Sequence, residues 1–277
     1  MHFQNFIKMK TQKIVTIILL LAVFQPFLYG QANERNLLNA TTDSIPKKQD
    51  CKAAKIVGIA LPAAMITYGA ISLGNNGIRQ IDFNVRNSIT QSNGFRFEDY
   101  LQYTPAVAAY AMKFGKVGST HDLLDMTILY GLSNLVAGGI TVGTKIKVGR
   151  MRPDNTDHQS FPSGHTETAF VAAEFLHQEF KDRSVWISVG GYTAAAVVGV
   201  ARIYHDKHWV SDVVTGAGVG ILSTKAVYWV YPYLQKIFRK CDIYNNYDKK
   251  HNPDYRQTFI FPGYSNGNLC LTLSKTF

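Results

Sequence analysis

Three short clusters of polar residues interrupt the apolar part of this 277-residue chain, and their residue types are those of an oxyanion site. The clusters are Lys145-x6-Arg152-Pro153, Pro162-Ser163-Gly164-His165 and Arg202-x5-His208-x3-Asp212. They contain one lysine and two arginines, and each guanidinium can hold two oxygens of a phosphate. Ser163 and Gly164 lie where an apolar segment begins. Backbone N–H groups and the positive end of a helix dipole would therefore face a bound anion there.

The two histidines supply chemistry that anion binding alone does not need. His208 and Asp212 are four residues apart, so they share a face of one helix. There the carboxylate would orient the imidazole and leave its other nitrogen free to attack phosphorus. We expect His165 to protonate the leaving alcohol and then to activate water. The predicted reaction is a double displacement through a phosphohistidine, without a metal or cofactor, because the cations neutralise the phosphoryl charge.

Together, the clusters resemble the tripartite motif of the type 2 phosphatidic acid phosphatase superfamily, which also includes bacterial class A acid phosphatases and vanadium haloperoxidases. The resemblance spans residues 145–212 and implies an all-helical core. It implies that His208 is the nucleophile, that His165 is the acid and base, and that Asp212 orients His208. It also implies a set of phosphate-binding residues: Lys145, Arg152, Ser163, Gly164 and Arg202. One position departs from the family pattern, since Ala201 stands where a serine usually precedes the arginine.

Helices must position these clusters, because the apolar segments around them are too long for strands. Six segments follow one another: 54–74, 100–117, 123–146, 165–180, 185–204 and 209–235. The clusters fall at the end of the third segment, at the start of the fourth, and between the fifth and the sixth. In an antiparallel bundle with short connections these ends lie on one side, which predicts a single pocket. We therefore expect an all-α fold, a membrane-embedded antiparallel bundle of about six helices.

Both ends of the chain differ from this bundle. Residues 1–30 combine lysines with an apolar run and are predicted to be a signal peptide or an N-terminal anchor. Residues 31–53 are predicted to be a polar linker, and residues 54–236 to be the helical phosphatase domain. In the predicted C-terminal tail, residues 237–277, Gly and Asn separate two apolar runs, so we expect a short β-hairpin-like structure there.

Composition narrows the choice of partner. The net charge is +10, but only 17% of residues are charged, against roughly 25% in a typical soluble domain. Excess cations favour an anionic partner. Three cations are assigned to the pocket, and basic clusters such as Lys181 with Arg183 fall on the opposite side. We therefore expect membrane and lipid phosphate as partners, and neither nucleic acid nor a protein partner.

Basic clusters also indicate the orientation in the membrane. By the positive-inside rule their side is cytoplasmic, so the pocket would face the periplasm from the inner membrane of a bacterial envelope. The leading hypothesis is a lipid phosphatase acting on lipid A, undecaprenyl diphosphate, phosphatidylglycerophosphate or phosphatidic acid. The alternative is a soluble periplasmic acid phosphatase acting on soluble phosphomonoesters. A vanadium haloperoxidase or a non-catalytic transporter or lipid-binding bundle would fit the same fold class.

Several neighbouring polar residues are expected to be structural. His205 and Asp206 are predicted on a loop surface, and His177 on a polar helix face. Lys147 and Arg150 are the nearest rivals of the motif cations, and we expect them to face solvent or lipid head groups. Tyr204 and Trp209 are predicted to be interfacial or packing aromatics, and Asp122 a helix cap.

Overall fold

The structure is a computed structural model, and it describes residues 52–92, 94–251, 258–265 and 268–275. The signal or anchor predicted for residues 1–30 and nearly all of the linker predicted for 31–53 lie outside the described residues. The chain divides into two compact units, Met1–Trp229 and Val230–Phe277. All residues of the three motif clusters belong to the first unit.

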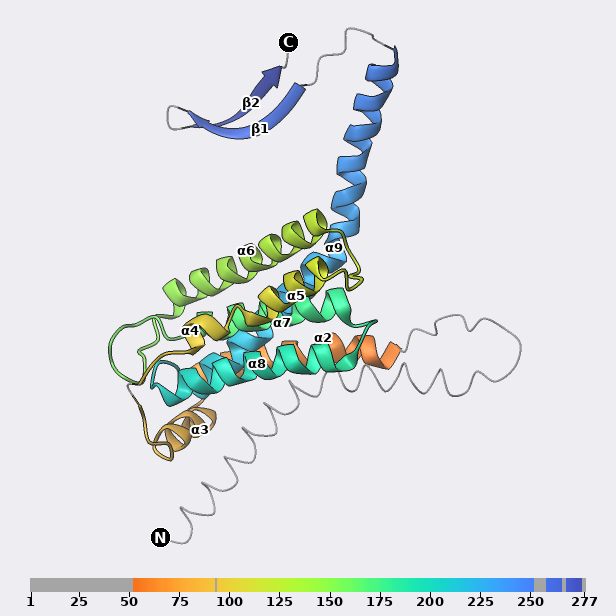
Figure 1. The fold of residues 1–277 in the computed structure, drawn as a ribbon. Helices are drawn as coiled ribbons and strands as arrows, with labels where there is room; N and C mark the ends of the chain where they lie inside the picture. The colour runs from red at the N-terminus through yellow and green to blue at the C-terminus, as the bar shows by residue number, and fades with distance from the viewer. Residues whose placement is uncertain (1–51, 93, 252–257, 266–267, 276–277) are drawn as a thin grey trace, which may run out of the picture. The chain divides into compact units, whose positions relative to one another are not determined.

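The described part of the chain contains eight helices rather than the expected six (Figure 1). They are α2 (Lys52–Gly74), α3 (Asn76–Arg86), α4 (Glu98–Leu101), α5 (Thr104–Phe114), α6 (Leu123–Val148), α7 (Gly164–Phe180), α8 (Val185–Tyr204) and α9 (Val210–His251). All six predicted segments lie on helices, but α3 is additional, and the segment predicted over 100–117 is split between α4 and α5. Pro105 explains the split, because proline is favoured in the first turn of a helix and has no N–H to continue the preceding one.

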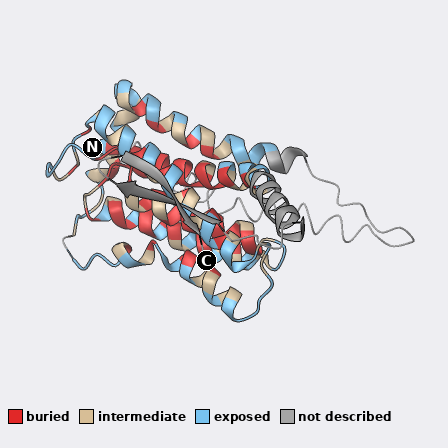
Figure 2. Ribbon diagram, turned by 90° about the horizontal axis from the view of Figure 1, so that it is seen from above, coloured by how far each residue is buried: buried red, intermediate tan, exposed pale blue. Residues whose placement is uncertain are grey.

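The central helix of the first unit is α7, which packs against α5, α6 and α8. Most of its residues are buried, and Figure 2 shows that the buried positions of the bundle face its interior. Glycines on α9 allow that helix to approach α7 closely. A Cβ atom on Gly216 would lie 2.5 Å from the carbonyl oxygen of Ser163, and one on Gly220 would lie 2.5 Å from that of Glu167. Small residues thus fix the start of α9 against the start of α7.

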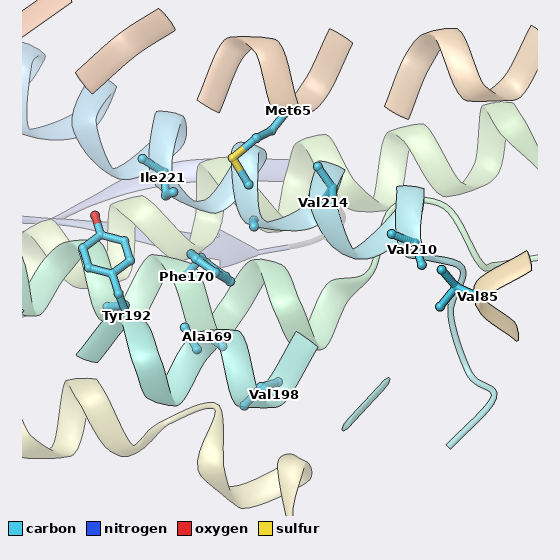
Figure 3. Close-up of a cluster of buried hydrophobic side chains, with 12 residues drawn as sticks. Met65, Val85, Ala169, Phe170, Tyr192, Val198, Val210, Val214 and Ile221 are labelled. Carbon is cyan, nitrogen blue, oxygen red and sulfur yellow. The ribbon is translucent and has the colours of Figure 1, made fainter. Parts of the chain in front are cut away.

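A hydrophobic core joins α2, α3, α7, α8 and α9 (Figure 3). It consists of Met65, Val85, Ala169, Phe170, Ala173, Tyr192, Ala195, Val198, Val210, Val214, Ala217 and Ile221. The rings of Phe170 and Tyr192 lie 6.1 Å apart within it. Because the core includes both the end of α8 and the start of α9, it holds the helix ends that carry the third motif cluster.

Within the described part of the chain, four helical stretches are long and apolar enough to cross a membrane. They are Ile56–Gly74, Leu123–Val148, Val185–Tyr204 and Val210–Gln235. Large apolar side chains point outwards from these helices, among them Leu135 (71% exposed) and Ile146 (79% exposed), as expected for a lipid-facing surface. By contrast, α5 has 11 residues and a length of about 16 Å, too short for a hydrocarbon core of about 30 Å.

Helix α9 continues beyond the predicted end of its apolar segment at residue 235 and reaches His251. Residues 236–251 are polar but contain neither Gly nor Pro, so nothing in them stops a helix, and Pro253 follows two residues after its end. In the second unit, strands β1 (Thr258–Ser265) and β2 (Asn268–Lys275) pair antiparallel, with Thr258 opposite Lys275.

Candidate active site

The three motif clusters meet at the end of the bundle where α6 ends, α7 begins, and α8 turns into α9. The backbone N–H of Ser163 donates to the carbonyl oxygen of Asp212 at 3.0 Å. Nη1 of Arg152 lies 3.5 Å from the carbonyl oxygen of Lys207. Contacts thus join the second cluster to the third and the first to the third, as short connections in an antiparallel bundle predict.

His208 is buried, and the loop before α7 sets the orientation of its ring. Its Nδ1 lies 2.8 Å from the carbonyl oxygen of Ser160. Because a carbonyl oxygen only accepts hydrogen bonds, Nδ1 carries the proton and Nε2 keeps its lone pair. Burial lowers the pKa of His208 to about 4, against an ordinary value of 6.5, so the ring is neutral near pH 7. The histidine is therefore in the protonation state that a nucleophile needs.

Asp212 contacts His208 less directly than their four-residue spacing predicts. The distance from Oδ2 of Asp212 to Nδ1 of His208 is 3.7 Å, too long for a hydrogen bond. Ser160 lies between them: its hydroxyl donates to Oδ2 of Asp212 at 2.5 Å, and its carbonyl oxygen accepts from His208. The carboxylate therefore orients the loop that holds the ring, because the backbone of residue 160 takes the position beside Nδ1.

Arg150 is buried beside Asp212, so the expectation that it faces solvent or lipid head groups is wrong. Its Nη1 donates to Oδ1 of Asp212 at 2.7 Å, and its Nη2 donates to Oδ2 of Asp82 at 2.7 Å. Two buried carboxylates thus share one guanidinium, which compensates the cost of burying its charge. No motif in the sequence points to Asp82, since it lies on α3, 68 positions before Arg150.

Asp82 also connects α3 to the start of α9. It accepts hydrogen bonds from the backbone N–H of Ser211 at 2.9 Å and from the Ser211 hydroxyl at 2.6 Å. Ser211 in turn accepts from Nη1 of Arg150 at 2.7 Å. This closed network holds the first turn of α9, which carries Asp212.

His165 is the second residue of α7, and it faces an acidic residue of α4. Its Nε2 lies 2.9 Å from Oδ1 of Asp99, with the two side chains about one-third exposed. Burial, followed by the charge of Arg202, lowers the pKa of His165, whereas the Asp99 carboxylate opposes this shift. Asp99 is not among the residues predicted from the sequence. Its place in the chain points to the site, because in an antiparallel bundle the start of the segment predicted at 100–117 lies on the pocket side.

Glu98, the neighbour of Asp99, is fully buried and contacts the third cluster. Its Oε1 accepts from Nη1 of Arg202 at 3.2 Å and pairs with Nδ1 of His205 at 2.7 Å. The prediction that His205 lies on a loop surface is therefore wrong, since the carboxylate stabilises this ring inside the protein. His177 is likewise buried, where its Nδ1 pairs with the Ser188 hydroxyl at 2.8 Å, so the polar face predicted for it points into the bundle.

The remaining predicted phosphate ligands surround the start of α7. Ser163 is the N-cap residue of α7 and Gly164 is its first residue, so N–H groups of the first turn have no acceptor within the helix. Lys145, in the last turn of α6, donates to the carbonyl oxygen of Gln159. Arg152 pairs with Asp157 at 2.7 Å. A helix N-terminus with nearby cations is an arrangement that can bind an anion.

Arg202 adds an unsatisfied donor to this arrangement. Its Nε is buried and has no hydrogen-bond partner among the described residues. Buried donors are nearly always paired, so this N–H group is available to a bound anion. A phosphate oxygen would satisfy it. Among the residues that the structure describes, no group of three His, Cys, Asp or Glu side chains is placed to hold a metal ion.

Exposed aromatic side chains lie on and around α4, the helix whose Asp99 contacts His165. Phe95 and Tyr100 are 76% and 71% exposed, and their rings stack with centroids 6.3 Å apart. Phe97 and Tyr103 are also exposed. Trp209 is buried and packs against Phe83, which agrees with its predicted packing role, while Tyr204 is exposed. Aromatic residues in such positions are typical of a membrane–water interface.

Three known proteins share sequence with this chain. A lipid A 1-phosphatase of Porphyromonas gingivalis is 38% identical over 169 residues, 61% of this chain and 36% of that protein. The bacitracin transport permease protein BcrC of Bacillus licheniformis is 33% identical, over 34% of this chain and 44% of that protein. Phosphatidylglycerophosphatase B of Bacillus subtilis is 33% identical, over 37% of this chain and 55% of that protein.

This chain therefore spans about a third to just over half of the length of these relatives. The comparison with protein families gives a more local result. Residues 126–236 match the PAP2 superfamily, and this range contains all three motif clusters together with most of α6 and the whole of α7 and α8. The part of the chain that resembles the PAP2 superfamily is thus the helical region that carries the candidate active site.

Proposed function

We propose that this protein is a metal-independent phosphatase that hydrolyses a phosphate ester or diphosphate of a membrane lipid through a phosphohistidine. One observation carries the proposal: His208 is buried, its Nδ1 is held by the carbonyl oxygen of Ser160, and its Nε2 is left as a nucleophile. A buried neutral histidine beside a cluster of cations can act as the nucleophile in phosphoryl transfer.

In the first step, the lone pair of His208 Nε2 forms a bond to phosphorus. The bond from phosphorus to the lipid oxygen breaks, and its electron pair goes to that oxygen, which takes a proton from His165. In the second step, water attacks the phosphohistidine, and the bond to Nε2 breaks. His165 accepts the proton of the water, so that free phosphate leaves and both histidines return to their starting states.

The phosphoryl oxygens would be bound by the predicted cations and by the start of α7. Guanidinium groups of Arg152 and Arg202 each present two donors to oxygens, and Lys145 adds a point charge. The unpaired Nε of Arg202 supports this role. N–H groups at Gly164 and His165 would stabilise the negative charge that develops in the transition state. Asp212 would stabilise the charge on the imidazole of His208.

A lipid substrate is supported by the surroundings of the site. Among the described residues, four helical stretches are long and apolar enough to cross a membrane, and exposed aromatics such as Phe95 and Tyr100 lie on or beside α4. The named relatives include phosphatases of lipid A and of phosphatidylglycerophosphate. Lipid A, phosphatidylglycerophosphate and undecaprenyl diphosphate are therefore the candidate substrates.

The site would open to the periplasm. Lys181 and Arg183 follow the end of α7 that is away from the site, and Lys236, Arg239 and Lys240 follow the predicted last segment. Because positive residues concentrate on the cytoplasmic side, the opposite end of the bundle would face outwards.

Phosphate release from the purified protein tests this proposal. The candidate lipids are compared with p-nitrophenyl phosphate, and the variant His208→Ala is compared with His158→Ala, an exposed histidine near the site. We expect release from at least one lipid, about a thousandfold loss or more in His208→Ala, and little change in His158→Ala. Full activity in His208→Ala would exclude the mechanism. Release of the protein by osmotic shock, together with hydrolysis of soluble esters alone, would favour a soluble phosphomonoesterase.

A further inference from the structure

The acid–base candidate His165 has a charged partner that lies outside the three motif clusters. Nε2 of His165 is 2.9 Å from Oδ1 of Asp99, a residue of the four-residue helix α4. Their sequence positions are 66 apart, so nothing local in the chain brings them together. The contact engages Nε2 and leaves Nδ1 as the nitrogen that can reach a leaving group.

The position of Asp99 is fixed by the residue before it. Glu98 is fully buried and is bound both by Arg202 and by His205. Helix α4 also packs against α7 and α8. A short helix tied to the third motif cluster through Glu98 therefore presents Asp99 to the second motif cluster. Helix α4 thus contacts both the second and the third motif clusters.

We propose that Asp99 is a positioning residue for His165, and that the two act together as the group that protonates the leaving oxygen. The inference rests on the proposed function, since it assigns a partner to the acid of that mechanism. Asp99 itself does not touch the substrate. It orients the ring so that Nδ1 faces the leaving oxygen, and its negative charge stabilises the protonated form of His165 before the proton is transferred.

The proton balance of the step is simple. As the bond from phosphorus to the leaving oxygen breaks, the proton on Nδ1 moves to that oxygen, and His165 becomes neutral. Asp99 keeps its charge throughout. When water later attacks the phosphohistidine, His165 takes up one proton at Nδ1 and is again paired with the carboxylate.

Three charged groups face His165 and set its protonation. Asp99 and Glu98 of α4 favour the charged ring, whereas Arg202 of α8 disfavours it together with burial. The pKa of His165 is lowered on balance. Removal of the Asp99 charge would lower the pKa further, so fewer molecules would hold the proton at neutral pH.

Asp99 could alternatively serve only as a structural ion-pair residue. It lies 3.4 Å from Nε of Arg96 and 3.8 Å from Nη1 of Arg202. A purely structural role and a role in proton donation differ in their dependence on the leaving group. An acidic phenol leaves without protonation, whereas a weakly acidic one needs a proton from the enzyme.

The test compares Asp99→Asn with the wild-type protein on two soluble aryl phosphates of similar size. Phenyl phosphate releases phenol, whose pKa is about 10, as for the tyrosine side chain, and p-nitrophenyl phosphate releases a much stronger acid. The kcat/KM value is measured because it reports the step in which the leaving group departs. We expect about a tenfold loss or more with phenyl phosphate, and less than about threefold with p-nitrophenyl phosphate. The basic limb of the kcat/KM profile moves to lower pH.

Two further variants control for effects on folding and on the overall charge. Asp99→Glu retains the carboxylate and recovers part of the loss with phenyl phosphate. Asp154→Asn removes a carboxylate that pairs with Lys207 at the same end of the bundle, and it shows no difference between the two esters. Equal losses on both esters in Asp99→Asn, with an unshifted pH profile, would overturn the inference. Failure of the proposed function is recognised separately, because wild-type protein would then release no phosphate or His208→Ala would remain active.

Discussion

Arg150 and Asp212 form an ion pair inside the bundle, with Nη1 and Oδ1 2.7 Å apart and side chains that are 4% and 0% exposed. The second guanidinium nitrogen binds Asp82. Loss of the cation would leave two buried carboxylates uncompensated. We therefore predict that Arg150→Met lowers the free energy of unfolding by about 3–5 kcal/mol and removes phosphatase activity.

Equilibrium unfolding in detergent measures this effect. The control is Arg183→Met, since Arg183 is an exposed arginine that binds the carbonyl oxygen of Gly118. Its change is expected to stay below about 1 kcal/mol. Equal losses in the free energy of unfolding in both variants would contradict the prediction that the buried network stabilises the fold.

His208 makes the stability of the protein depend on pH. Burial lowers its pKa from 6.5 to about 4 in the folded state, so between these values the unfolded chain binds a proton that the folded protein does not. As the pH falls from 6.5 towards 4, His208 therefore lowers the free energy of unfolding by up to about 3 kcal/mol. His208→Gln removes this contribution, and its unfolding free energy is predicted to fall less steeply over this range. Parallel pH curves for the two proteins would contradict the prediction.

Gly216 is needed for the contact between α9 and the start of α7. A Cβ atom there would lie 2.5 Å from the carbonyl oxygen of Ser163, so Gly216→Ala must displace the N-cap of α7. We expect a loss of about 1–3 kcal/mol in stability and a clear loss of activity. Gly138→Ala on α6 is the matched control, because no atom lies near its added Cβ. Its stability is expected to be unchanged or slightly higher.

The exposed aromatic residues on and beside α4 are predicted to affect the hydrolysis of lipid substrates but not that of soluble esters. Replacement of Phe95 and Tyr100 by serine removes exposed aromatic surface around α4, the helix whose Asp99 contacts His165. The KM for lipid phosphates in mixed micelles is expected to rise several-fold, whereas hydrolysis of p-nitrophenyl phosphate stays the same. Trp186→Ser serves as the comparison, since Trp186 is 71% exposed but lies at the start of α8, away from the site. An equal rise in KM in both variants would indicate a general effect of membrane association.

Chelation of metals is predicted to leave the reaction intact. Lys145, Arg152 and Arg202 supply positive charge to the phosphoryl group, so no divalent cation is needed in the proposed mechanism. Phosphate release measured after treatment with EDTA should match that of the untreated protein. A loss that added Mg²⁺ or Zn²⁺ restores would show that a metal takes part.

Local pattern in the sequence determines much of this protein. The lengths of the apolar segments predict helices, and all six predicted segments are helical. Fixed spacing within each cluster, such as four residues between His208 and Asp212, places side chains together on one face. Short connections then require the helix ends to meet, so the sequence alone assigns the three clusters to one region.

Only the tertiary structure decided how these residues are held. Arg150 and Arg152 are the same residue type two positions apart, yet one is buried between Asp82 and Asp212 and the other pairs with Asp157 near the surface. The contact of Ser160 with His208 and that of Asp99 with His165 depend on loops and short helices far away in sequence. Helical periodicity carries no information about such contacts. They form because the packed helices leave buried charges and polar groups that must find partners in space, wherever those partners lie in the chain.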